Sequence, residues 1–342
     1  MDSAQGTIEN LKQKIQASNL PADISDKLLN LLKFIGPPAG GGIEFEKLVS
    51  YVEFVISLPF NKTSQDILDL ARAKQILDKN HYGLAGVKNR ILEYLSVLIL
   101  RQKNGTKEGH APILAFVGLV GTGKTSLAYS IAESLGRAII RIPFGGLGDP
   151  LQLRGQSRVK SDAEPGQIIK ALKVTGVANP VILLDEIDRV AEEGRVDIMG
   201  VLVELLDPAQ NHAFVDHFLD FPFDLSKVLF ITTANNTGNI ATAVMDRLEP
   251  IQMPAYSDEE KLVIGKDYLL PKAIKEAGLT TDQVIIDSSV WPLILRPLGF
   301  DAGIRSLDRN LEGLVRKVAR KIVEGTSGPF RIDSSNIGEY IA

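Results

Sequence analysis

The stretch GLVGTGKTS, residues Gly118–Ser126, constrains the fold of this chain more than any other stretch. It fits the pattern G-x-x-x-x-G-K-[ST], with the apolar run ILAFV before it and the helix-like run SLAYSIAESLG after it. Glycines allow successive backbone N–H groups to turn inward at the start of a helix, where the helix dipole favours an anion. The sequence therefore predicts a strand, a phosphate-binding loop and a helix, in that order.

Two side chains of this loop are expected to act directly on a nucleoside triphosphate. Lys124 would reach the β- and γ-phosphates, and the hydroxyl of Thr125 would bind Mg²⁺. The other residues expected around the phosphates are Gly118, Gly121, Thr122, Gly123 and Ser126.

An acidic pair follows a second apolar run in NPVILLDEID, residues Asn179–Asp188. The end of this predicted buried strand would place Asp185 and Glu186 beside the phosphate loop. Asp185 could then hold Mg²⁺, and Glu186 could polarise the attacking water. Because a nucleotide switch or a kinase needs no adjacent glutamate, the pair favours hydrolysis.

A third predicted strand, in KVLFITTANN, ends at Asn235. An amide at this point could orient the lytic water or sense the γ-phosphate. An asparagine at a strand end is more often a turn former. Its position after the acidic strand favours the functional interpretation here.

The apolar runs divide the chain into three predicted parts. Residues 81–255 alternate short apolar runs (Ile113–Val117, Ala138–Ile142, Val181–Leu184, Val228–Thr232) with helical stretches, which is typical of a parallel sheet covered by helices. Residues 1–80 are expected to be a helical segment, called the neck below, and residues 256–342 a helical lid. The expected fold class is α/β, with a P-loop core between the neck and the lid.

Local patterns predict individual elements of the neck and the lid. In the neck, apolar stripes run over 24–35 and 45–56, GPPAGGG at 36–42 separates them, and Thr63–Asp66 resembles a helix start. In the lid, the expected helices are Asp258–Ala277, Ser288–Leu298 and Ala302–Glu324, with a short strand near Val284–Ile286. No other strand is expected after about residue 255.

Composition excludes several classes of protein. The 342 residues are 44% hydrophobic and 23% charged, with a net charge of −4 and no basic stripe, which argues against nucleic-acid and anionic-membrane partners. No apolar run is long enough to span a membrane, and the N-terminus MDSAQGTIEN has no apolar or Arg-rich targeting pattern. The absence of cysteine excludes disulfides, thiolate metal sites and cysteine catalysis.

The order of the phosphate loop, VILLDEID, TAN, DRLE and GIRSLDR resembles that of AAA+ ATPases. The stretches ARAKQILDKNHYGLAGVKNRILEYL and LLDPAQNHAFVDHFLDFPFDLSKVLFITTAN are similar to the ATPase module of Lon proteases. This resemblance extends over roughly residues 57–325. It implies a P-loop NTPase core and a helical lid, with ATP and Mg²⁺ as ligands.

The resemblance also implies roles for residues outside the phosphate loop. Tyr82 and Gly83 would border the adenine, and Asn235 would be the first sensor. Arg305 would be the lid sensor, and Arg247 would be an arginine finger for the γ-phosphate of a neighbouring subunit. A finger that acts in trans implies a homo-oligomeric ring, expected to be a hexamer.

The family's Ser–Lys peptidase domain would follow the lid, and no Ser or Lys of this sequence lies in that peptidase motif. We therefore expect this polypeptide to hydrolyse ATP within a longer ATP-dependent serine protease that unfolds proteins for quality control. The segments VTGVANPVILLDEID and AGIRSLDR are slightly more similar to the peroxisomal branch. They predict the peroxisomal matrix, with the mitochondrial matrix and the bacterial cytoplasm as alternatives.

The loop GQSRVKSDAEPG, Gly155–Gly166, departs from the family pattern. The resemblance places it on a central pore, where relatives carry an aromatic–aliphatic pair that grips the polypeptide. Here those positions hold Lys160 and Ser161. The alternatives are therefore a remodelling or chaperone ring with weak translocation and, less favoured by the charge, a nucleic-acid-directed motor.

Overall fold

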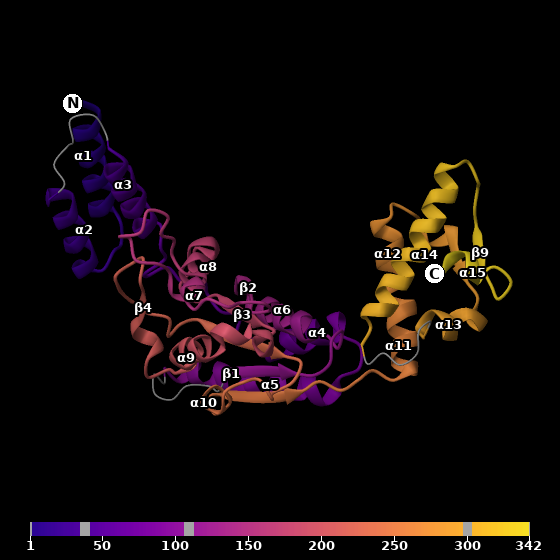
Figure 1. Cartoon of the computed structure of the whole chain (residues 1–342). Coiled ribbons are helices and arrows are strands. Elements are labelled where there is room, and N and C mark those ends of the chain that lie inside the picture. The colour runs from indigo at the N-terminus through magenta and orange to yellow at the C-terminus, as the bar shows by residue number, and fades with distance from the viewer. Residues whose placement is uncertain (1, 35–41, 106–112, 297–302, 342) are drawn as a thin grey trace.

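The computed structural model describes residues 2–34, 42–105, 113–296 and 303–341. The chain forms an arc, with a sheet and its covering helices in the middle, the neck at one end and the lid at the other (Figure 1). No helix in the described ranges is long and apolar enough to cross a membrane.

The central sheet has five parallel strands in the order β2-β3-β6-β1-β7. Their bounds are Ile113–Val117 (β1), Ile139–Pro143 (β2), Val181–Asp185 (β3), Leu229–Ala234 (β6) and Leu248–Gln252 (β7). Because all five run in one direction, their carboxyl ends share one edge, where α/β proteins bind ligands. The expected α/β fold with a parallel sheet is confirmed.

Helices cover both faces of the sheet, which explains why its central strands are mostly apolar. Side chains of β1 alternate: Ala115 and Val117 face one core, and Leu114 and Phe116 face the other. The first core includes residues of α7 (Leu151–Arg154), α8 (Gln167–Thr175), α9 (Arg195–Leu206) and α10 (Thr242–Met245). The second includes α4 (Leu70–Asn80), α5 (Ala85–Asn104) and α6 (Lys124–Leu135).

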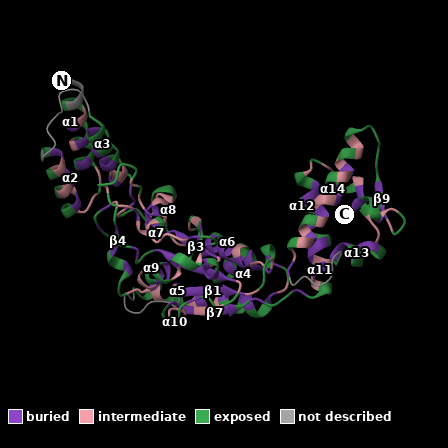
Figure 2. Cartoon of the chain, viewed as in Figure 1, coloured by how far each residue is buried: buried purple, intermediate pink, exposed green. Residues whose placement is uncertain are grey.

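The neck contains α1 (Asp2–Ala17), α2 (Ala22–Phe34) and α3 (Ile43–Ile56). The apolar stripes predicted α2 and α3, whereas α1 followed only from the expectation of a helical segment. It packs against an antiparallel hairpin of the core, β4 (Phe214–Asp216) and β5 (Phe221–Phe223). Phe218, between these strands, lies edge-on to Tyr51 at 5.7 Å and to Phe54 at 5.6 Å between ring centroids. Figure 2 shows buried residues in these helices as well as along the sheet. Most of the predicted GPPAGGG break, residues 36–41, lies outside the described residues.

The helix start predicted at Thr63–Asp66 is wrong. Residues 63–69 are not helical, and α4 starts at Leu70, where the Asp69 carboxylate accepts hydrogen bonds from the backbone N–H of Ala71 (2.9 Å) and Arg72 (3.1 Å). Contacts with the core hold the preceding segment extended. Asp66 pairs with Arg137 at 2.7 Å, and the backbone N–H of Ile67 donates to the Leu135 carbonyl at 2.9 Å. Tertiary contacts thus outweigh the local capping pattern.

The lid contains α11 (Asp258–Ile264), α12 (Leu270–Glu276), α13 (Trp291–Leu295), α14 (Arg305–Val323) and α15 (Ile337–Tyr340). The first expected lid helix, Asp258–Ala277, is interrupted by a π-helical turn, Gly265–Leu269, just before Pro271, which has no N–H to donate. The second expected helix, Ser288–Leu298, is shorter in the structure, where α13 covers Trp291–Leu295. Residues 297–298 of that helix and residue 302 of the third expected helix lie outside the described ranges. The short strand predicted at Val284–Ile286 is confirmed as β8.

Four strands of the described chain were not expected from the sequence: β4, β5, β7 and β9 (Phe330–Ile332), the last of which pairs with β8. The expectation of a single strand after residue 255 is therefore wrong. Short 3₁₀ turns occupy Ile187–Arg189, Glu192–Gly194, Asn211–Ala213, Thr281–Gln283 and Ser288–Val290. Although α4 precedes residue 81, it packs on α6 of the core, and the division at 80/81 and 255/256 stays a prediction.

Candidate nucleotide-binding site

The loop Gly118–Ser126 joins β1 to α6 as the sequence predicted. Its glycines are required for different reasons. Gly121 (φ 82°) and Gly123 (φ 92°) adopt left-handed backbone conformations that favour glycine. A Cβ at Gly118 would lie 2.7 Å from the Cβ of Met253, so this position accommodates a close approach of the chain after β7.

Lys124 and Asn235 come together at this loop. The Lys124 ammonium donates to the carbonyls of Gly118 (2.6 Å) and Leu119 (2.9 Å) and to Oδ1 of Asn235 (3.0 Å). Burial lowers the pKa of Lys124, although nearby carboxylates oppose that effect. The buried Nδ2 of Asn235 has no partner among the described residues. The pair thus offers a cation and an unused N–H donor at the place where phosphates are expected.

Asp185 is the last residue of β3 and Glu186 follows it, at the same edge of the sheet. Glu186 has a left-handed backbone (φ 59°), a conformation that costs about 1–3 kcal/mol for a non-glycine residue and often marks a functional site. Thr233 of β6 stabilises this turn, because its hydroxyl accepts from the Glu186 N–H at 2.9 Å and donates to Asp185. The nearest cation to the Glu186 carboxylate in the described ion pairs is Arg189, at 3.7 Å.

Thr125 and Asp185 form an oxygen donor set that suits Mg²⁺. The Thr125 hydroxyl lies 3.3 Å from Oδ1 of Asp185. Mg²⁺ is usually bound by one or two protein oxygens together with waters and substrate phosphates, so a larger cluster is not needed. Accordingly, the described residues contain no group of three or more His, Asp or Glu suited to hold a metal.

Two residues that support this site were not identified from the sequence. Asp188, almost fully buried, accepts from the backbone N–H of Asn235 at 3.0 Å and so fixes the end of β6. Arg141 of β2 contacts Oδ2 of Asp185 through Nε at 2.6 Å. The only sequence signal for Arg141 is a charge inside the otherwise apolar run AIIRIPF.

Tyr82 and Gly83 lie between the core and the lid. Gly83 has φ 63°, and a Cβ there would lie 2.7 Å from Oε1 of Glu260 in α11. The Tyr82 ring is partly exposed, 6.5 Å from that of Tyr268. A hollow of about 590 Å³ adjoins them, lined by residues 84–87 and 250–252 with Arg90, Pro254 and Glu260. The predicted contact of Tyr82 and Gly83 with adenine is compatible with this position and stays a prediction.

His81, next to this pair, is a buried structural residue. Burial, reinforced by Lys88, lowers the pKa of His81 to about 4, so the imidazole is neutral at physiological pH. Its Nε2 lies 2.9 Å from the hydroxyl of Ser130 in α6.

Arg305 starts α14 and lies against the phosphate loop. The N–H of Ile304 donates to the Gly121 carbonyl at 3.1 Å, and a Cβ on Gly121 would lie 3.2 Å from that of Arg305. The exposed Arg305 side chain therefore starts beside the loop that the sequence assigned to phosphates.

Arg247 lies away from this site in the same chain. Its carbonyl accepts from the N–H of Ile113, at the start of β1, whereas the phosphate loop follows the end of β1. Its guanidinium donates to Oδ2 of Asp207 at 2.7 Å and to the carbonyl of Ala243 at 2.6 Å. Arg247 holds the pKa of Asp207 at about 2 through this hydrogen bond, with help from the Ala209 N–H.

The loop Gly155–Gly166 lies outside the nucleotide site and is closed at its base. The buried Asp216 carboxylate accepts from the Gly166 N–H at 2.8 Å, and a Cβ on Gly166 would lie 2.7 Å from the Gly155 nitrogen. Lys160 and Ser161 are exposed at the tip, beside Val159, which is 95% exposed.

The same loop contacts the neck. The Arg158 guanidinium lies 3.8 Å from the centroid of the Tyr51 ring in α3 and 3.9 Å from the Asp220 carboxylate in the β4–β5 turn. The neck, the hairpin and the exposed loop are therefore joined directly.

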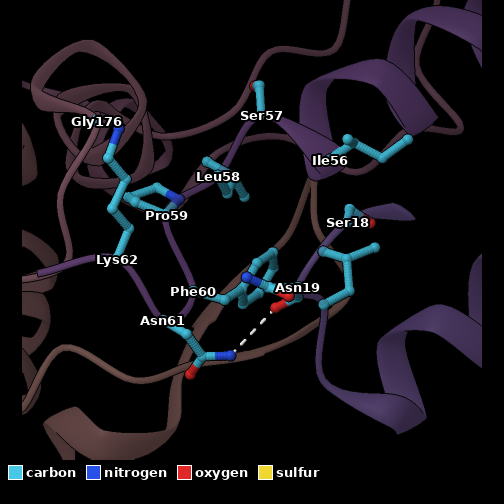
Figure 3. A pocket seen from close by; sticks show the side chains of 11 residues that line it. Ser18, Asn19, Ile56, Ser57, Leu58, Pro59, Phe60, Asn61, Lys62 and Gly176 are labelled. Atoms are coloured by element: carbon cyan, nitrogen blue, oxygen red, sulfur yellow. Dashed lines mark hydrogen bonds between the residues drawn. The ribbon is translucent and has the colours of Figure 1, made fainter. Parts of the chain in front are cut away.

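A cavity of about 460 Å³ lies where the neck meets the core (Figure 3). It is lined by residues 18–20, 56–62 and Gly176, and the Asn61 amide donates to the Asn19 carbonyl across it at 3.1 Å. Its one charged lining residue, Lys62, is exposed. The cavity shares no residue with the nucleotide site.

Comparisons with known proteins agree with this geometry. Residues 114–254 match the ATPase family associated with various cellular activities (AAA), and residues 275–330 match the Lon protease AAA+ ATPase lid domain. The chain is 44% identical to the Lon protease of Lawsonia intracellularis, 41% to that of Desulfovibrio desulfuricans and 40% to Lon protease 2 of Thermus thermophilus.

These matches cover 99% of this chain but 40%, 38% and 43% of the three relatives. The chain thus spans about two fifths of the length of the Lon proteases that it matches. The AAA match ends at residue 254, close to the start of α11, and the lid match covers most of the helices that follow. The chain therefore contains an AAA ATPase domain followed by a Lon-type AAA+ lid domain.

Proposed function

We propose that this chain binds ATP with Mg²⁺, hydrolyses it, and uses the reaction to move protein substrates. The observation that carries the proposal is the meeting of Lys124, Asn235 and the Asp185–Glu186 pair at the carboxyl ends of three neighbouring strands. No other described part of the chain combines a phosphate-binding loop, a metal-binding oxygen pair and a further carboxylate beside them.

The chemistry assigned to each residue follows from its contacts. Lys124 would exchange the carbonyls of Gly118 and Leu119 for β- and γ-phosphate oxygens, which are stronger acceptors for an ammonium. Mg²⁺ would neutralise phosphate charge, with Thr125 and Asp185 as its protein ligands. Glu186 would accept a proton from the attacking water, and the Nδ2 of Asn235 would donate to that water or to the γ-phosphate.

The lid would respond to the nucleotide through Arg305. Because α14 starts against the phosphate loop, a contact between Arg305 and the γ-phosphate would depend on the angle of the lid. Loss of that phosphate would remove the contact and allow the lid to turn. This is a two-state coupling between the site and a rigid element.

Arg247 supports an assembly in which neighbouring chains share sites. Five residues of β1 separate it from the phosphate loop, roughly 16 Å at the rise of a strand, which is longer than any side chain. Arg247 can therefore act as a finger only on another subunit, as in other NTPases that receive an arginine in trans. A hexameric ring is the proposed assembly.

Unfolded or damaged proteins are the proposed substrates, and threading toward a peptidase domain is the proposed role of the whole protein. The tip of the loop Gly155–Gly166 would touch the polypeptide through Lys160 and Ser161. Because neither residue is aromatic, the observation also supports a second candidate: a remodelling or chaperone ring that translocates weakly. Lys160→Tyr in the full-length protein tests the weak grip: a gain in degradation of an unfolded protein supports weak translocation, and no gain beside robust wild-type degradation refutes it.

The compartment remains a prediction. The peroxisomal matrix was favoured from the sequence, with the mitochondrial matrix and the bacterial cytoplasm as alternatives. The relatives compared above are bacterial, which supports the last of these. Fractionation of cells that express the full-length protein would decide among them.

The proposal is tested by ATP turnover and oligomeric mass, with and without nucleotide. Glu186→Gln should keep ATP binding and lose hydrolysis by at least about 10²-fold, because the general base is removed. Arg247→Ala should also bind ATP, lose about 10³-fold or more in turnover, and be partly rescued in mixed rings that contain Glu186→Gln subunits. Normal turnover in Glu186→Gln would refute the hydrolytic site, and normal turnover in Arg247→Ala would refute the shared site.

A further inference from the structure

Arg141 of β2 forms an ion pair with the proposed metal-binding carboxylate. Its Nε and its Nη2 both lie 2.6 Å from Oδ2 of Asp185. The Asp185 side chain is only 4% exposed, whereas that of Arg141 is 48% exposed. A carboxylate this deeply buried needs a partner of opposite charge, and Arg141 supplies it from the solvent side.

The two oxygens of Asp185 face different groups. Oδ2 is occupied by Arg141, while Oδ1 lies 3.3 Å from the Thr125 hydroxyl and accepts from Thr233. A carboxylate held at both oxygens has a fixed plane. The Arg141 contact thus leaves Oδ1, and not Oδ2, on the side of the phosphate loop where the metal would bind.

Strand pairing fixes the position of Arg141 as well. In the β2–β3 register Pro143 lies opposite Asp185, and Arg141 lies two residues earlier, on the same face as Pro143. The N–H of Phe144 donates to the Asp185 carbonyl at 2.8 Å and anchors the end of the pair. Arg141 therefore reaches Asp185 diagonally from a rigid strand.

We infer that Arg141 is a positioning residue for Mg²⁺. It holds the Asp185 carboxylate in the orientation that presents Oδ1 to the metal, and it does so without touching nucleotide or metal itself. The inference rests on the proposed function, because it assumes that Asp185 and Thr125 bind Mg²⁺. Residues that orient a metal ligand in this way typically contribute about 10–100-fold to metal affinity.

The test measures binding and not turnover. In a Glu186→Gln chain, which keeps ATP intact, the dissociation constant of a fluorescent ATP analogue is measured with Mg²⁺ and with EDTA. The dissociation constant in EDTA divided by the constant in Mg²⁺, called the Mg²⁺ ratio, reports how strongly the metal and the nucleotide bind together. Arg141→Met should lower this ratio by about tenfold or more. Arg141→Lys keeps the charge but loses the planar fork, so its Mg²⁺ ratio should lie between those of the parent chain and of Arg141→Met.

Arg137→Gln is the matched control. Arg137 lies just before β2 and pairs with Asp66 at 2.7 Å, with side chains 16% and 6% exposed, so this pair is more buried than the Arg141–Asp185 pair. Its loss should reduce the melting temperature and leave the Mg²⁺ ratio unchanged. If Arg141→Met does not fold, Arg141→Lys provides the same comparison, since it leaves no uncompensated buried charge.

The outcomes are distinct. A lower ratio in the Arg141 variants, with the control unchanged, supports the inference. An unchanged ratio overturns it, and a higher ratio overturns it in favour of competition between Arg141 and the metal. If Mg²⁺ does not affect binding even in the parent Glu186→Gln chain, the proposed metal site itself fails and the inference fails with it.

Discussion

The contact between Gly303 and the phosphate loop offers a sharp test of how the lid and the site are joined. A Cβ at Gly303 would lie 2.4 Å from the Val120 carbonyl oxygen and 2.7 Å from both the Cα and the carbonyl carbon of Gly121. All three are backbone atoms, so no side chain can rotate away. Gly303→Ala therefore forces the start of α14 away from the phosphate loop.

The size of the effect follows from these distances. Ordinary contacts begin at 3.4 Å, so the two backbones must separate by about 1 Å. That movement would break the hydrogen bond from the Ile304 N–H to the Gly121 carbonyl, now 3.1 Å long. Overpacking of this kind costs about 1–3 kcal/mol. Since a nucleotide needs the loop and the lid together, Gly303→Ala should weaken ATP binding by roughly 5- to 150-fold, at 1.4 kcal/mol for each factor of ten.

The assay combines nucleotide affinity with the fluorescence of Trp291, the single tryptophan of the chain, which is buried in the lid. Weaker binding with unchanged Trp291 emission shows that the lid has moved as a folded unit. Gly313→Ala is the control: it lies in α14, and its nearest neighbour is the Arg316 Nη2 at 3.9 Å. That variant should bind normally and gain up to about 1 kcal/mol of stability from helix propensity. Wild-type affinity in Gly303→Ala would refute the reasoning.

Two further predictions concern contacts outside the nucleotide site. Because the chain has no native cysteine, a spin label on Lys160→Cys reports the loop alone. Arg158→Gln, which loses the contact with Tyr51, should make this label more mobile. Identical spectra with and without Arg158→Gln would show that the contact does not hold the loop. The second prediction concerns pH. The pKa of Asp207 is depressed from 3.8 to about 2 by Arg247, so the stability from this pair is fully present above pH 3.8 and is lost as the pH falls through about 2. The melting temperature of wild type should exceed that of Asp207→Asn by a constant amount from pH 5 to 7 and by a smaller amount below pH 4. A difference in melting temperature that is undiminished at pH 2 would contradict this.

The central strands were predictable because they are buried on both faces. Residues 113–117 and 181–184 are buried, and a strand without an exposed face is apolar along nearly all of its length. β7 was missed because it is an edge strand. Its sequence LEPIQ contains the charged Glu249 and also Pro250, which is tolerated because one side of the strand has no partner. β4, β5 and β9 have three residues each, too few to show a period.

The residues of the candidate site also divide into those that could be predicted from the sequence and those that could not. Lys124, Thr125, Asp185, Glu186 and Asn235 could be expected from the sequence because each would act directly on phosphate, metal or water. That chemistry permits few residue types at few positions along a strand–loop–helix unit. The structure brings these residues together at one edge of the sheet.

Arg141 and Gly303 could not be assigned in this way, since their importance comes from a neighbour distant in sequence. Arg141 contacts Asp185 only because β2 pairs with β3, and Gly303 is constrained only because α14 begins on the phosphate loop. An arginine in an apolar strand and a glycine before a helix have many ordinary explanations. A sequence therefore identifies groups whose chemistry is fixed by a ligand, while the fold decides which groups orient them. For this reason, substitutions at Arg141 and Gly303 test the structure itself, whereas substitutions at Lys124 or Glu186 test only the motif.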